Sequence, residues 1–229
     1  MKRTRLWQLV LVAGLGCCAM ALFSSLDVWG QSGVRGGVAG AKITRLDLGY
    51  VKSPTLNVTM PAGKGMSGTD SWLQLYALFS TQGGQGRDVE GKSTWHDEVT
   101  VEWAVMIMPR ANNRTGKPIL MRRTIVYVDV DDSRREHCAD IYLRPGFLKR
   151  YCGATQLGRR DLKTFVRIKM NGQTVDSLSS DPADKTRWWE QEPPRVDIQE
   201  NELLSRDETP YAAIDYDRYE QVKRAKGGN

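Results

Sequence analysis

Two cysteines in the second half of the chain belong to a residue type that can do chemistry. Cys138 and Cys152 enclose a stretch of 15 residues, and His137 directly precedes the first of them. A zinc site needs a second pair of ligands, which is missing at any usual spacing. A cysteine nucleophile needs a base, yet the chain has only His96 and His137, and neither thiol has a protease signature around it. We therefore expect no catalytic residue, no metal and no cofactor.

The chain begins with the layout of a secretory signal peptide. Basic residues at positions 2, 3 and 5 precede an almost wholly apolar run over residues 6–21. Small residues offer cleavage after Ala21 or, less typically, after Gly30. A transmembrane anchor is the alternative, but it needs about 20 apolar residues. Acylation of Cys17 or Cys18 is a further alternative.

We expect residues 1–30 to be a signal peptide, with no membrane span after its removal. The mature protein would then work in the periplasm, at the outer membrane or outside the cell. Two cysteines would remain, and thiols in such oxidising compartments commonly form disulfides. A short strand followed by a helix from Pro145 to a cap at Gly153 could bring the two ends together. We predict a Cys138–Cys152 disulfide worth about 3 kcal/mol, with free thiols as the alternative.

Alternating apolar residues indicate the elements that position these cysteines. In DEVTVEWAVMI, apolar side chains recur at every second position, as a half-buried strand requires. Asn171-Gly172, after another alternating run, favours a tight hairpin. We predict an all-β fold, an immunoglobulin-like antiparallel sandwich of about seven or eight strands with one short helix over residues 43–180. A partly open barrel is the alternative, and the Gly-rich residues 31–42 would be a flexible leader.

The composition changes at residue 181, where a C-terminal arm over residues 181–229 begins. The arm would be partly extended, and a helix over residues 210–225 is possible because Pro210 suits a first helical turn. Trp188 and Trp189 either cap the sandwich or contact another subunit. The candidate contact residues in the arm are Trp188, Trp189, Tyr211, Tyr216 and Tyr219. We expect a chain that lacks the arm to keep its sandwich folded.

The formal net charge of +6 is distributed unevenly. Residues 110–170 carry 15 basic and 6 acidic side chains, whereas residues 181–229 carry 8 and 12. The simple interpretation of the basic region is a solvated sheet face. The alternative is a patch for an acidic partner: nucleic acid, lipid head groups, a polyanionic glycan, or the acidic arm itself. The candidate patch residues are Arg122, Arg123, Arg134 and Arg135. Because no nucleic-acid module is recognisable, we expect no nucleic-acid partner.

The stretches ITRLDLGYVKSP and ETPYAAIDYDRYEQVK, together with the signal peptide, resemble secreted pilus-like proteins of Verrucomicrobia. The resemblance implies an immunoglobulin-like sandwich similar to archaeal pilins, encoded near type IV pilus and secretin components, with no known catalytic residues. A conventional type IV prepilin start is missing from the sequence. The resemblance therefore favours a non-enzymatic accessory component of a pilus or secretion apparatus, which contacts envelope proteins or its own copies. The alternative is a surface module that binds an acidic glycan or another polyanion.

Overall fold

The computed structural model describes residues 40–54, 70–82, 95–108, 116–134, 136–215 and 218–224. All of them belong to one compact unit, residues 36–229. The expected signal peptide lies outside the described residues and stays a prediction. Residues 40–42, expected as the end of a flexible leader, are instead the start of the first strand.

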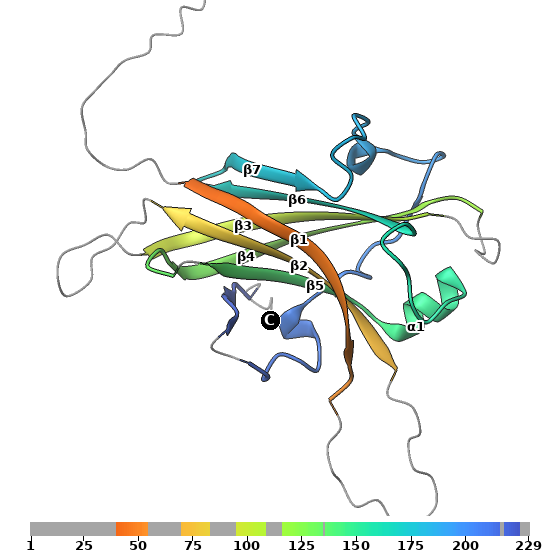
Figure 1. Ribbon diagram of the computed structural model, residues 1–229, viewed down its shortest axis with the longest axis horizontal. Coiled ribbons are helices and arrows are strands. Elements are labelled where there is room, and N and C mark those ends of the chain that lie inside the picture. Colours follow the sequence, from red (N-terminus) through yellow and green to blue (C-terminus); the bar gives the residue numbers. More distant parts are fainter. Residues whose placement is uncertain are drawn as a thin grey trace, which may run out of the picture. The chain divides into compact units, whose positions relative to one another are not determined.

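Two sheets face each other, as Figure 1 shows. Sheet A has the order β1 (Gly40–Lys52), β2 (Ser71–Gln82), β5 (His137–Leu143) and β9 (Leu204–Ser205). Sheet B has the order β10 (Gln221–Val222), β4 (Ile119–Asp131), β3 (Trp95–Ile107), β6 (Leu162–Met170) and β7 (Gln173–Ser179). The short β8 (Asp197–Ile198) adds to β4 in parallel, and every other pair is antiparallel. The predicted β-sandwich is confirmed.

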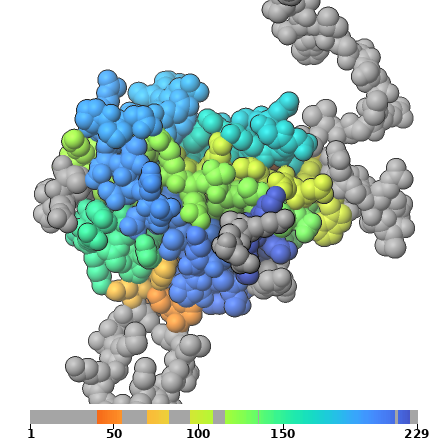
Figure 2. All heavy atoms as spheres, turned by 180° about the vertical axis from the view of Figure 1, so that it is seen from behind, coloured from red at the N-terminus to blue at the C-terminus, as the bar shows by residue number. Residues whose placement is uncertain are grey.

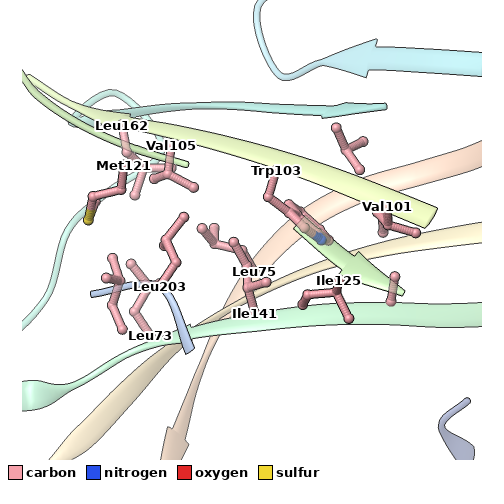
Figure 3. Close-up of a cluster of buried hydrophobic side chains, with 14 of the residues drawn as sticks. Leu73, Leu75, Val101, Trp103, Val105, Met121, Ile125, Ile141, Leu162 and Leu203 are labelled. Carbon is pink, nitrogen blue, oxygen red and sulfur yellow. The ribbon is translucent and has the colours of Figure 1, made fainter. Parts of the chain in front are cut away.

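The core lies between the sheets because the strands alternate in the way the sequence predicts. Val101 and Trp103 on β3 are buried and lie across the sandwich from Leu75 on β2 (Figure 3), and Val99 belongs to the same core. Leu203, from the C-terminal arm, is 1% exposed and belongs to the same core. The arm thus supplies part of the core, and the expectation that the sandwich folds without residues 181–229 stays a prediction.

Two local predictions also agree with the structure. Pro145 occupies the first turn of α1 (Pro145–Phe147), which continues into a π-helical turn, η1 (Leu148–Cys152). Gly153 ends that turn with φ 61°, a left-handed conformation that glycine adopts without a steric penalty. Asn171 and Gly172 join β6 to β7 with φ values of 51° and 75°, which suits the twist of a tight hairpin.

The sandwich has two seams where the sheet edges approach each other. At one seam the β1 backbone N–H of Ile43 donates to Asp176 Oδ2 on β7 at 2.7 Å. The opposite seam, between β4 and β5, is covered by residues 203–215 and 218–222, which contribute β9 and β10. The described part of residues 210–225 contains turns and β10 rather than the helix considered from the sequence. Within the described residues, no helix is long and apolar enough to cross a membrane.

Candidate functional site at the C-terminal segment

The residues that the sequence singles out gather around the C-terminal segment, defined here as the described residues 181–215 and 218–224. Figure 2 shows this segment in blue as it runs over the green strand β4. It adds β8 and β10 to β4 and β9 to β5, so it bonds to both sheets. A single acidic segment thus covers the edges that the sandwich would otherwise leave bare.

The tryptophan pair covers the outer face of sheet B. Trp188, in the 3₁₀ turn η2 (Trp188–Glu190), is 2% exposed and packs in a cluster with Met106, Leu120 and Phe165. Trp189 stacks on the Phe165 ring, with centroids 4.0 Å apart and planes 5° from parallel. Trp188 therefore has the position of a cap, and its surface is used within the chain.

The predicted basic patch is paired with the C-terminal segment. Arg122 donates to the Trp189 carbonyl at 2.9 Å, to the Gln191 carbonyl at 2.6 Å and to Glu192 at 3.0 Å. Arg123 donates to Glu208 at 2.7 Å. The sequence left four possible partners for these arginines. In the structure, both arginines bind one of the four, the acidic arm of the same chain.

Arg134 makes the third such pair and Arg135 lies outside the described residues. Arg134 donates to Glu220 at 3.0 Å, and the same carboxylate oxygen lies 2.8 Å from Nδ1 of the buried His137. The other ring nitrogen of His137 lies 3.2 Å from the Thr81 hydroxyl. His137, considered as a metal ligand or base, instead anchors the end of the C-terminal segment to β5.

Tyr211 closes the outer face of sheet A. It is 7% exposed, stacks on Tyr142 with centroids 5.3 Å apart, and meets Trp72 edge to face at 6.0 Å. Its hydroxyl donates to the Val51 carbonyl at 3.2 Å. Tyr219 is half-buried under the Arg206 guanidinium, which lies 3.4 Å from its ring centroid. Tyr216 lies outside the described residues.

A buried ion pair lies beneath these rings. Arg206, in the 3₁₀ turn η3 (Arg206–Glu208), donates to Asp140 at 3.3 Å and to the Tyr142 hydroxyl at 2.9 Å. Tyr142 donates to Asp140 at 2.6 Å, and Gln74 donates to it at 3.0 Å. Burial raises the pKa of Asp140 because the cost of desolvating its carboxylate exceeds what these donors return. Nothing in the sequence marked Asp140 or Arg206, since neither belongs to a motif.

The predicted disulfide is not present: Cys138 and Cys152 are both free and buried. Ala139, Ile141 and Leu143 of β5 face the core, so Cys138 points to the outer face of sheet A. Cys152 instead belongs to the core between the sheets. Burial, with the nearby Asp140 carboxylate, raises the pKa of the Cys138 thiol to about 12, so the thiol stays protonated and unreactive.

A hollow of about 780 Å³ lies beside the end of the segment. Its lining includes Tyr219 and the charged residues Asp140, Arg206 and Glu220. Trp95, at the start of β3, also lines it and is 43% exposed. Sequence reasoning missed Trp95 as a contact candidate, although a large aromatic side chain at the polar end of a strand was a usable signal. No group of His, Cys, Asp or Glu suited to a metal ion occurs in the part of the chain described.

These features define an antiparallel β-sandwich that is closed by its own C-terminal segment. A protein-family model matches residues 36–226, most of the chain, so the protein belongs to that family. It is also similar to a protein from Akkermansia muciniphila known from a crystal structure, with a TM-score of 0.69 and 22% identity over 82% of this chain and 95% of that one. The two findings support the resemblance to a protein family of Verrucomicrobia. No curated protein matches the chain.

Proposed function

We propose that the protein is an exported, non-enzymatic component of the cell envelope that serves a pilus or secretion apparatus through protein contacts. The observation that carries this proposal is the family match over residues 36–226, which points to pilus-like proteins. The immunoglobulin-like character implied by the resemblance belongs to the same proposal. Its partners would be envelope proteins or further copies of the chain.

The structure narrows the surface on which such a partner would bind. Trp188 and Tyr211 are buried against their own chain and offer little area to another protein. Trp95 and Tyr219 line the same hollow and keep part of their surface exposed. Exposed aromatic side chains beside a hollow are typical anchors of protein interfaces. We therefore assign the contact to the hollow rather than to the tryptophan pair.

The polyanion alternative gains no support from the contacts. Arg122, Arg123 and Arg134 each pair with a carboxylate of the C-terminal segment. A polyanion at this place would have to displace Glu192, Glu208 and Glu220 first. Weakening of a complex by added salt would identify this alternative, since salt screens exposed charges within about 10 Å at 0.1 M.

The proposal is tested by site-specific photo-crosslinking in the producing cells. A photoreactive residue placed at Trp95 or at Tyr219 should trap a pilus or secretin component in the envelope fraction. The matched control is the exposed Gln173 at the β6–β7 hairpin, where no such product should form. A protein that stays in the cytosolic fraction, or equal products at all three positions, would contradict the proposal.

A further inference from the structure

A second hollow opens at the other side of the sandwich, where β7 ends and β1 continues. Its volume is about 390 Å³, within the usual size range of small-ligand sites. Leu46 and Leu48 of β1 line it together with Leu162 of β6. Leu75 of β2, which is 1% exposed and belongs to the main core, lines it as well. The hollow is therefore an apolar opening into the space between the sheets.

Charged side chains also line this opening, and the basic ones outnumber the acidic ones. Arg159, Arg160 and Lys163 line it together with Asp47 and Asp181. Arg159 donates to Asp47 at 2.6 Å, and Lys163 lies 3.4 Å from Asp181. Among the described residues, Arg160 has no hydrogen-bond or ion-pair partner, and it is exposed. An anion at this opening would thus meet a guanidinium that no carboxylate among the described residues neutralises.

The turn that carries these two arginines is fixed before any ligand arrives. The Gly158 N–H donates to Asp161 Oδ2 at 2.6 Å, and the Asp161 N–H donates back to the Gly158 carbonyl at 3.0 Å. The Asp161 carbonyl in turn accepts from the Met108 N–H, just beyond β3, at 2.8 Å. Arg159 and Arg160 form the tip of this turn. A preorganised turn lowers the ordering cost of binding.

We propose that this opening binds a medium-chain fatty acid, with the hydrocarbon chain among the four leucines and the carboxylate on Arg160. An apolar interior with a cationic mouth matches the two parts of such a molecule. The site shares no lining residue with the hollow beside Tyr219, so it stands or falls independently of the envelope role proposed above. The occupant is a single-chain carboxylate rather than a peptide strand, because β1 protects its own edge. In that edge the Leu48 N–H donates to its neighbour Asp47 at 2.8 Å, and a β-bulge lies between Ile43 and Arg45.

Isothermal titration calorimetry of the full chain with hexanoate, octanoate and decanoate, below micelle-forming concentrations, tests the apolar part. Each methylene buried in the opening should tighten binding about fourfold until the volume is filled. Nonyltrimethylammonium has the same nine-carbon tail with the opposite charge and should bind more weakly than decanoate. Equal binding across the acid series, or stronger binding of the cation, would overturn the proposal.

Variants test the location of the site. Leu46→Trp should fill the opening and abolish decanoate binding, and Arg160→Glu should weaken it about fivefold or more. The matched control is Arg195→Glu, an exposed arginine away from the opening, which should leave the affinity unchanged. Unfolding midpoints of the variants separate loss of the site from loss of the fold. Unchanged decanoate binding by a folded Leu46→Trp protein, or binding of an apolar acidic peptide without any binding of decanoate, would contradict the assignment.

Discussion

The C-terminal segment is held to the sandwich by different chemistry at two places. They are called here the apolar end, near residue 188, and the polar end, near residue 206. Near residue 188 it covers sheet B with stacked aromatic rings and an apolar cluster. Near residue 206 it covers sheet A with a buried ion pair and a layer of hydrogen-bonded tyrosines. The apolar end gains from burial alone, whereas the polar end is stable only while every buried charge keeps its partner. Mutation and pH should therefore affect the two ends differently.

Replacement of Trp188 by alanine should have the largest effect. The side chain is 2% exposed, and its loss leaves a cavity over Phe165 and Leu120. We expect the free energy of unfolding to fall by about 3–5 kcal/mol, measured by urea denaturation. Trp95→Ala is the matched control, since Trp95 is 43% exposed, and it should change stability by about 0.5 kcal/mol or less. Similar losses in both variants would show that Trp188 is not a cap.

Arg206→Met should cost somewhat less, about 3 kcal/mol, because it leaves Asp140 buried without its cation. Tyr142 and Gln74 still donate to that carboxylate, which places the loss at the lower end of the range for a broken buried pair. The double variant with Asp140→Asn should recover part of the stability. Arg123→Met, at a pair with more exposed partners, should cost about 1 kcal/mol or less. If the stability changes of Arg206→Met and Asp140→Asn simply added up in the double variant, Arg206 and Asp140 would not be energetically coupled.

Asp140 also predicts a pH dependence of the polar end. Its folded pKa is raised above the ordinary value of 3.8, so its contribution to stability is complete below that value and is lost as the pH rises through the raised pKa. Relative to Asp140→Asn, the natural protein should therefore lose stability as the pH rises from about 4 through the raised pKa of Asp140.

Asp184 supplies the opposite trend as a control. The side-chain hydrogen bond from Lys163, at 2.5 Å, lowers its pKa to about 2, so its contribution is present above pH 3.8 and is lost as the pH falls through about 2. Comparison with Asp184→Asn should show a difference only in acid. If the stability difference from the natural protein varied with pH in the same way for Asp140→Asn and Asp184→Asn, the opposite pKa shifts of the two carboxyls would be contradicted.

The smallest change in stability is expected from reduction of the protein. Addition of a reductant should leave the unfolding midpoint unaltered, because Cys138 and Cys152 are not bonded. Both thiols should resist iodoacetamide in the native protein, and both should react in urea without prior reduction. If a disulfide closed these 15 residues, a reductant would instead lower the free energy of unfolding by about 3 kcal/mol and shift the midpoint.

The sandwich was predictable because the alternation of apolar and polar residues in a strand is a pattern of neighbouring residues. The run from Val99 to Ile107 and the Asn171-Gly172 turn are local signals, and the structure agrees with both. The same alternation argued against the disulfide, since Ala139, Ile141 and Leu143 take the inner face of β5 and leave Cys138 outside. Compartment and spacing carry no information on this register, so they predict a disulfide that the structure does not contain.

The contacts of the C-terminal segment were less predictable because they join residues far apart in the chain. Arg122 and Glu192 are 70 positions apart, and His137 and Glu220 are 83 apart. The uneven charge indicated that the acidic arm was one candidate partner of the basic region, but it could not choose among the four. The two hollows depend on where strands end in space, which no motif records.

The placement of Leu203 and β10 also determines when the protein can finish folding. A ribosome makes these residues after the strands that they cover, so the edges of β4 and β5 stay bare until Leu203 and β10 have been made. A growing chain can pair β1 with β2 early, yet the core stays open until Leu203 joins it. The sandwich is therefore completed only after this segment emerges, and a chain that stops before Leu203 exposes unpaired strand edges to chaperones and proteases.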